Sequence, residues 1–126
     1  RGPFTVEGAG GPVELRPFHV QHGDIDALGF RIGGLVYLPD VLSIPDAAWP
    51  ELAGLDCLIV DALRRKPHPT HAHLDLTLSW IVRVKPEQAV ITNMHLDLDY
   101  EVLMAELPPG VSPAYDGRVI TFDDVP

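Results

Sequence analysis

Two apolar runs with an amphipathic segment between them constrain the fold of this chain more than any other feature. Residues 55–60 form an apolar run broken only by Asp56, and residues 88–94 form a second one, as is typical of buried strands. Between the two runs, apolar side chains recur at helical spacing at Leu74, Leu78, Ile81 and Val82. Pro86 ends this pattern. Strand, helix and strand within 40 residues predict a βαβ unit with a right-handed crossover.

The first third of the chain is predicted to be β. Residues 4–7 and 13–16 alternate apolar and polar side chains, and Pro17 indicates a strand edge or a bulge. The runs 29–32 and 35–38 flank Gly33-Gly34, a dipeptide typical of a tight hairpin turn.

Three shorter elements complete the expected secondary structure. A short helix capped by Ser43 or Asp46 is expected to end at Gly54. A second helix is expected from Tyr100 to Leu107, because its apolar residues share one face before a Pro-Pro-Gly stop, and a last strand is expected at residues 118–122.

Composition limits the classes of partner. The 126 residues suffice for one domain, and no apolar run approaches the ~20 residues that span a bilayer. A net charge of −9 disfavours nucleic acid and anionic membranes. No signal peptide is visible, and the single cysteine, Cys57, excludes an internal disulfide, so that we expect a cytoplasmic protein.

Four residues far apart in the sequence have the chemistry of a metal site. His22 lies before an apolar segment, and Asp40 and His95 follow predicted strands. His73 lies directly before the predicted helix and 22 residues before His95. Imidazoles and carboxylates ligate catalytic zinc, and strand ends hold such ligands rigidly. Each residue also has a structural interpretation, since a histidine at a strand end is more often hydrogen-bonded than ligating, and Asp40 after Pro39 suits a turn.

A polar loop follows the first of the buried strands. Asp61 suits a hydrogen bond within its own loop. The basic run Arg64-Arg65-Lys66 is interpreted either as a solvated loop or as a phosphate-facing one, and His68 and His71 are expected to be exposed to solvent.

The chain resembles the C-terminal part of a metallo-β-lactamase-fold hydrolase. The resembling stretches cover most of the sequence and are His22-Gly23, Gly29-Phe30-Arg31-Ile32, Val36-Tyr37-Leu38-Pro39-Asp40, His73, Thr92-Asn93-Met94-His95 and Ala114-Tyr115-Asp116-Gly117. The closest branch is the phosphoribosyl cyclic phosphodiesterase type of phosphonate breakdown. The resemblance implies an α/β fold, the αββα sandwich of this superfamily, with residues 1–126 as its C-terminal portion only.

The resemblance also implies roles for the candidate residues. His22 would ligate one of two divalent ions (zinc or manganese), Asp40 would bridge them, and His95 would complete the second. His73 would donate a proton or stabilise charge on a phosphate, and Asp61 would orient a ligand or the nearby loop. A water activated by the two cations would then attack phosphorus in a small phosphate ester.

One signature of that superfamily is absent from this sequence. The His-x-His-x-Asp-His motif supplies ligands to both metals, but residues 1–18 contain no histidine. We therefore expect residues 1–126 to be a partial domain lacking that N-terminal half. Its inner sheet face would be uncovered and would drive the segment to aggregate or to form a homodimer.

Three functions remain open on the sequence alone. The first is a metal-dependent phosphodiesterase that opens a small cyclic phosphate. The second is a non-catalytic half-domain or fragment that needs another chain. The third is a hydrolase of the same fold acting on thioesters or lactones.

Overall fold

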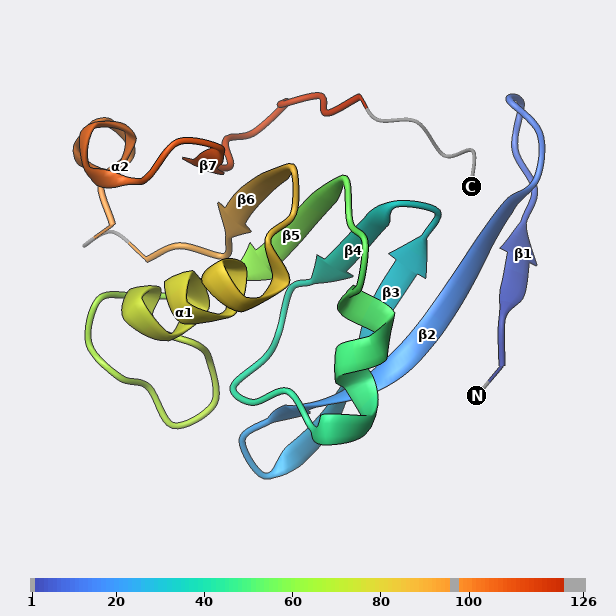
Figure 1. The fold of residues 1–126 in the computed structure, drawn as a ribbon, viewed down its shortest axis with the longest axis horizontal. Coiled ribbons are helices and arrows are strands. Elements are labelled where there is room, and N and C mark those ends of the chain that lie inside the picture. The colour runs from blue at the N-terminus through green and yellow to red at the C-terminus, as the bar shows by residue number, and fades with distance from the viewer. Residues whose placement is uncertain (1, 96–97, 122–126) are drawn as a thin grey trace.

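A computed structural model describes residues 2–95 and 98–121 of the chain. The described residues form one sheet of seven strands in sequence order (Figure 1). The strands are β1 (Phe4–Val6), β2 (Val13–His22), β3 (Ile25–Ile32), β4 (Leu35–Leu38), β5 (Cys57–Asp61), β6 (Gln88–Thr92) and β7 (Val111–Pro113). The connecting helices are η1 (Asp46–Leu52), α1 (Leu74–Val84) and α2 (Tyr100–Glu106).

The sheet is mixed, with an antiparallel half followed by a parallel half. Strands β1 to β4 pair antiparallel through hairpins, and β4 to β7 pair parallel through the three helical connections. The predicted Gly33-Gly34 hairpin is confirmed, with Gly33 at φ 56°, a conformation that glycine adopts without steric cost. The predicted βαβ unit is confirmed as β5, α1 and β6.

Two of the three shorter elements differ from the expectation. The segment before Gly54 is a 3₁₀ helix with Pro50 inside it, and its N-cap is Pro45 without a side-chain hydrogen bond, so the predicted cap was wrong. The strand expected at residues 118–122 is absent over residues 118–121, while Phe122 lies outside the described residues. The last described strand is instead β7, which pairs in parallel with β6.

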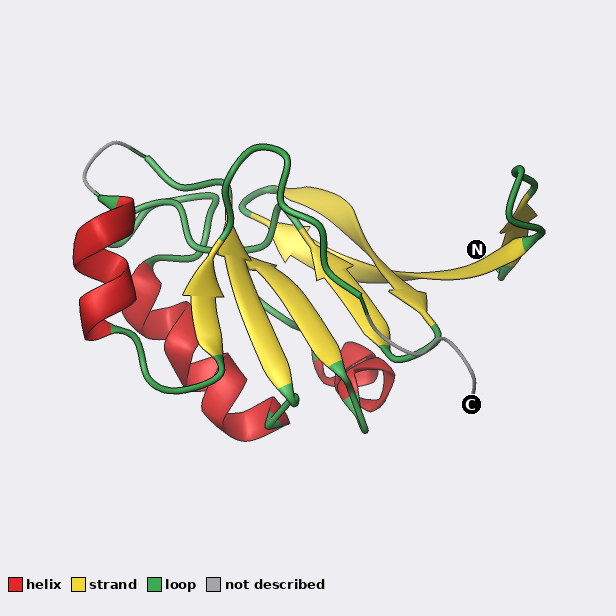
Figure 2. Cartoon of the chain, turned by 90° about the horizontal axis from the view of Figure 1, so that it is seen from above, coloured by secondary structure: helices red, strands yellow, loops and turns green. Residues whose placement is uncertain are grey.

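The helices η1 and α1 cover one face of the sheet, and α2 packs beside β7 (Figure 2). The side chains on this covered face form the hydrophobic core, which includes Phe18, Val36, Leu38, Leu58, Val60 and Ile91 from the strands and Leu52, Trp80, Ile81 and Leu103 from the helices. None of the helices in the described part of the chain has the length and apolar character needed to cross a bilayer.

The opposite face of the sheet carries no helix. The segment after β7 crosses it over the parallel strands (Figures 1 and 2), and there Cys57 and Val90 are buried. Nearer the antiparallel half, Tyr37 on this face is 41 % exposed, and Ile59 is partly buried outside the core cluster. This helix-free face is therefore apolar and only partly covered by the described residues.

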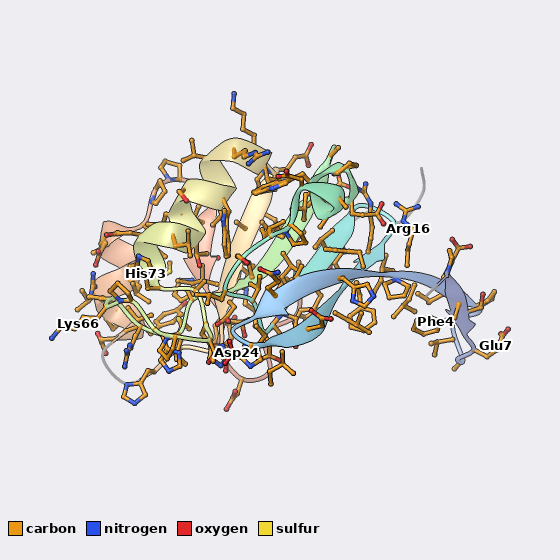
Figure 3. All side chains as sticks on the ribbon, turned by 90° about the horizontal axis from the view of Figure 1, so that it is seen from below. Phe4, Glu7, Arg16, Asp24, Lys66 and His73 are labelled. Atoms are coloured by element: carbon orange, nitrogen blue, oxygen red, sulfur yellow. The ribbon has the colours of Figure 1, made fainter. Side chains whose placement is uncertain are left out.

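A two-stranded arm extends the sheet beyond the body. Strand β1 pairs with residues 13–15 only, and the arm projects outward with Phe4 and Glu7 on it (Figure 3). The register pairs Phe4 with Leu15 and Val6 with Val13, so the apolar residues of both strands share one face. Pro17 comes after the residues of β2 that pair with β1, and it pairs with β3 on its other side. Among the described strands, β2 therefore has a free edge at Pro17, as the sequence predicted.

Candidate metal site

Four segments that end or turn at the same edge of the sheet bring the polar residues together. The β2–β3 turn and the loops after β4 and β5 lie side by side at this edge (Figure 1). Asp40 lies in the loop after β4, Asp61 is the last residue of β5, and Asn93 directly follows β6. Because β4, β5 and β6 are parallel, their carboxyl ends meet there, as in other open α/β sheets.

His22, Asp40 and His71 form the group most suited to a metal ion. One ligand atom from each residue lies within 4.8 Å of the ligand atoms of the other two. A divalent transition metal binds imidazole nitrogen and carboxylate oxygen at about 2.0–2.2 Å, so small side-chain rotations suffice for all three to contact one ion. The donor set therefore fits one divalent metal such as zinc or manganese.

His22 is oriented by the loop that follows β5. Its Nδ1 lies 2.6 Å from the carbonyl oxygen of Thr70, which can only accept, so Nδ1 donates and Nε2 keeps its lone pair. The two segments meet at Gly23, where a Cβ would lie 2.6 Å from Thr70 Cγ2. Gly23 also has φ 66°, a backbone conformation that residues other than glycine rarely adopt.

We expect Gly23→Ala to destabilise the protein and to weaken metal binding, because the added Cβ pushes the Thr70 loop away from His22. Gly54→Ala is the matched control, since Gly54 has φ 63° and nothing lies within 4 Å of its Cβ position. Backbone strain, about 1–2 kcal/mol, is common to both variants, and the steric contact should add about 1–3 kcal/mol at Gly23 alone. Urea unfolding measures the stability of the two variants, and a zinc titration measures their affinity for the metal. Equal effects of the two variants would show that the contact between the added Cβ and Thr70 has no consequence.

Asp61 and His71 form a buried pair next to this group. The Asp61 side chain is 0 % exposed, and its Oδ2 lies 2.7 Å from His71 Nδ1 and 3.1 Å from the backbone nitrogen of Val41. Burial raises the pKa of the Asp61 carboxyl, while the hydrogen bonds from His71 and Val41 oppose this rise. The sequence analysis expected Asp61 to orient a ligand or its loop, and the structure places it against His71.

His73 and His95 lie outside the cluster formed by His22, Asp40 and His71. His73 is the N-cap residue of α1, where its side chain makes no capping hydrogen bond. His95 lies beyond the end of β6, with its backbone nitrogen donating to Leu63 O at 2.6 Å. The roles predicted for these two histidines, proton donation and ligation, stay predictions.

The structure adds His71 and Asn93, which the sequence analysis had not selected. His71 was expected to be exposed, but its side chain is only 17 % exposed. Asn93, at φ 62°, donates from Nδ2 to Asp61 Oδ1 at 3.4 Å. His71 and Asn93 are 22 residues apart, the same spacing as His73 and His95. The sequence signal that could have found them is therefore this spacing, read two positions earlier.

The basic run after β5 is bound to the protein itself. Arg64 donates to the carbonyl oxygens of Lys66 and Pro67, and Arg65 forms a bidentate pair with Glu106 at 2.6 and 2.8 Å. These contacts favour the structural interpretation of the two arginines over a phosphate-facing role.

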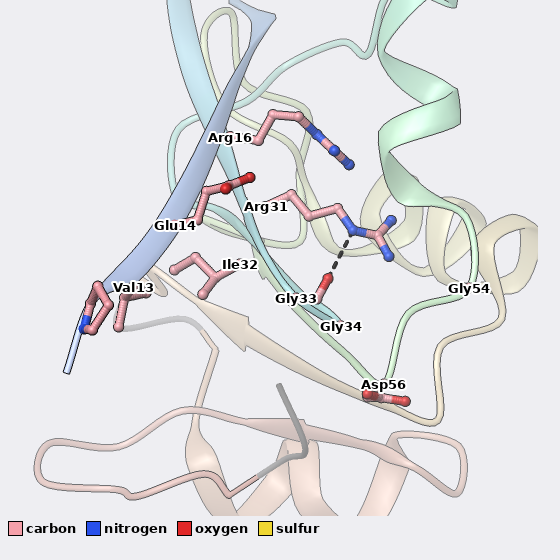
Figure 4. A pocket seen from close by; sticks show the side chains of 10 residues that line it. Val13, Glu14, Arg16, Arg31, Ile32, Gly33, Gly34, Gly54 and Asp56 are labelled. Carbon is pink, nitrogen blue, oxygen red and sulfur yellow. Dashed lines mark hydrogen bonds between the residues drawn. The ribbon is translucent and has the colours of Figure 1, made fainter. Parts of the chain in front are cut away.

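A large open cavity lies at the other end of the strands (Figure 4). It has a volume of about 700 Å³ and is bordered by the β3–β4 turn and by Asp56, which precede β4 and β5. The two arginines that line it already have protein partners, because Arg31 donates to three backbone carbonyls and Arg16 pairs with Glu51 at 2.9 Å. Its position at the opposite ends of the strands separates this cavity from the candidate metal site.

Two comparisons with known proteins bear on the family of this chain. Residues 1–94 match the sequence model of a family described as a beta-lactamase superfamily domain. The crystal structure of a diphosphatase from the PhnP family superposes with a TM-score of 0.90 at 38 % identity, covering 97 % of this chain and 47 % of that one. The αββα-type fold expected from the sequence is confirmed by these matches.

Two further proteins are similar to the chain over almost its whole length. Zinc-bound PqqB from Methylobacterium extorquens has the same fold, with a TM-score of 0.67 at 17 % identity over 94 % of this chain and 53 % of that one. An octanoyltransferase of Porphyromonas gingivalis is 28 % identical over 125 residues, which is 97 % of this chain and 24 % of that protein. The chain spans about half the length of the two solved structures and a quarter of the curated relative.

Proposed function

The chain belongs to the beta-lactamase superfamily, and we propose that the whole protein is a metal-dependent hydrolase that opens a small cyclic phosphate ester. The observation that carries this proposal is the convergence of His22, Asp40 and His71 at the carboxyl edge of the sheet. Two imidazoles and a carboxylate, each from a different segment of the chain, are the ligand types of catalytic zinc sites.

The residues at this edge have separate roles in the proposed hydrolysis. When bound, a divalent ion supplies an activated water at neutral pH and neutralises charge on a phosphate. His22, Asp40 and His71 would hold the ion, and the hydrogen bond from His22 to Thr70 would orient the first of these rings. His73 would protonate the leaving oxygen, the role that the sequence analysis gave to it.

The choice of a phosphate substrate is supported by the similar PhnP-family diphosphatase. A small substrate is favoured over nucleic acid because the chain carries a net charge of −9 and both arginines of its basic run are bound to protein groups. A small cyclic phosphodiester is therefore the first substrate to test, with a diphosphate as the comparison.

A second ion and the rest of the domain are part of the same proposal. The group of donors found in the described residues suits one ion. We propose that a further segment, of the kind that makes the similar structures about twice as long, would supply the ligands for a second ion, with Asp40 as one ligand of the completed site. That segment would also cover the helix-free face of the sheet.

Metal analysis and a substrate panel test the function. We expect the whole protein to bind two equivalents of zinc or manganese and to hydrolyse a cyclic nucleotide or cyclic ribose phosphate faster than a diphosphate or a thioester. Removal of the metal with a chelator should abolish turnover, and readdition should restore it. A protein without tightly bound metal would favour the non-catalytic half-domain, and thioester turnover alone would reassign the substrate.

Paired histidine variants test which ring handles the proton. His73→Ala is expected to lower kcat by roughly 10²–10⁴-fold while leaving the bound metal in place, as for loss of a general acid. His71→Ala is expected to lower metal content as well, because His71 belongs to the donor cluster. Turnover and metal content are measured on the same samples. If His73→Ala retained full turnover, the proton-donor role would pass from His73 to another group.

A further inference from the structure

We infer that Asp61 is a positioning residue for the candidate metal site: its buried carboxylate holds the Nδ1 proton of His71 and leaves Nε2 of that ring for the cation. This inference rests on the proposed function, because it concerns how one ligand of the proposed site is oriented. Asp61 itself is absent from the group of mutually close donors, so its contribution passes through His71.

Two segments hold the Asp61 carboxylate in place. Oδ2 accepts from the backbone nitrogen of Val41 at 3.1 Å, in the loop that also carries Asp40. Oδ1 lies 3.4 Å from Asn93 Nδ2, after β6. An acceptor that two different segments hold in this way can in turn fix the ring that donates to it.

The contact distances decide the tautomer of His71. Its Nδ1 lies 2.7 Å from Asp61 Oδ2 and 3.4 Å from Asn93 Nδ2. An ionised carboxylate can only accept, so a lone pair on Nδ1 would face a second acceptor at the shorter distance. A proton on Nδ1 turns that repulsion into a charge-assisted hydrogen bond, which outweighs the longer contact with the amide.

The same arrangement recurs at His22, with a different acceptor. There the carbonyl oxygen of Thr70 takes the Nδ1 proton at 2.6 Å. Both rings thus keep Nε2 for an ion, and their centroids lie 4.4 Å apart. A backbone carbonyl cannot be removed by substitution, so Asp61 is the side chain through which this orientation can be tested.

The experiment compares Asp61→Asn and Asp61→Ala with Thr77→Val in the whole protein. Thr77 is buried beside Asp61 and bonds only to its backbone oxygen, so Thr77→Val disturbs the same region without touching His71. In the metal-free protein, long-range ¹H–¹⁵N spectra report which ring nitrogen of His71 carries the proton. Zinc titration then gives the affinity of each variant.

We expect His71 to carry its proton on Nδ1 in the unsubstituted protein. Zinc affinity should fall about tenfold in Asp61→Asn, which keeps one acceptor oxygen, and about 100-fold in Asp61→Ala, which keeps none. Thr77→Val should stay within about threefold of the unsubstituted protein, since its loss of a hydrogen bond acts on stability.

Two results would overturn the inference. One is a proton on Nε2 of His71 in the unsubstituted protein, which is read without any variant and so survives a folding failure of Asp61→Ala. The other is unchanged zinc affinity in a folded Asp61→Ala variant. Absence of zinc binding and turnover in the unsubstituted protein would instead contradict the proposed function, so the two failures are distinguishable.

Discussion

Replacing Asp40 by alanine is expected to abolish metal-dependent turnover while leaving the fold intact. Asp40 supplies the carboxylate of the donor cluster, and its side chain is exposed in the loop after β4. Loss of that ligand should remove several kcal/mol of transition-state stabilisation, which corresponds to a fall in kcat/KM of roughly a thousandfold or more. An exposed loop residue contributes little to stability, so the free energy of unfolding should change by less than about 1 kcal/mol.

Asp46→Ala is the control for this variant. Asp46 is also exposed and acidic, and it lies in the first turn of η1, outside the donor cluster. Both changes remove one negative charge, so a general electrostatic effect would appear in both. Bound metal, kcat/KM and urea unfolding are measured for the two proteins. Retained metal and turnover in Asp40→Ala would exclude Asp40 as a ligand.

The local patterns that predicted the sheet correctly are those whose physics is contained in a few neighbouring residues. Gly33-Gly34 makes a tight turn because glycine alone accepts φ 56° freely, and the turn fixes the register of β3 and β4. The run from Leu55 to Val60 is mostly apolar and mostly buried, and Pro86 follows the amphipathic helix, so β5, α1 and β6 could be predicted from periodicity.

The composition of the donor cluster depends on details that the sequence does not contain. The strand was predicted to continue to Met94, yet β6 ends at Thr92, because Asn93 takes a left-handed conformation, φ 62°, and bonds to Asp61. That end brings Asn93 to the site in place of His95. Likewise, His71 is drawn in by a hydrogen bond to Asp61 across ten residues of loop, a contact that no local spacing predicts.

The position of the last strand could not be predicted from composition either. Residues 118–121 have strand-like composition, but the parallel edge of β6 is taken by β7, which begins directly after Pro108-Pro109-Gly110. Composition does not specify which of two neighbouring segments pairs with the edge of a sheet. The segment after β7 instead crosses the helix-free face.

That helix-free face leads to the second large effect. Side chains on a strand alternate between faces, so Val36 and Leu38 enter the core beneath the helices while Tyr37 stands on the other side. On β3 and β5 the same face carries Phe30 and Ile59, both only partly buried. An apolar sheet face of this kind is normally covered by a second layer, which our proposal assigns to the further segment of the whole protein.

Tyr37→Lys is expected to act differently on the whole protein and on residues 1–126 alone. In the whole protein the new charge would be buried between two layers, and the free energy of unfolding should fall by about 3 kcal/mol or more. In the isolated segment Tyr37 is already 41 % exposed, so the charge costs little there and should reduce the self-association that the bare face causes. Val82→Lys is the control, because Val82 is 70 % exposed on α1, away from this face.

Urea unfolding and light scattering measure the two effects on the four proteins. If the face is covered, Tyr37→Lys destabilises the whole protein far more than Val82→Lys, and it shifts the isolated segment from aggregates or dimers toward monomers. Equal, small losses of stability for both variants in the whole protein would mean that no second layer packs on β4. The difference between the two lysine variants therefore measures the burial of this face, independently of any metal or substrate.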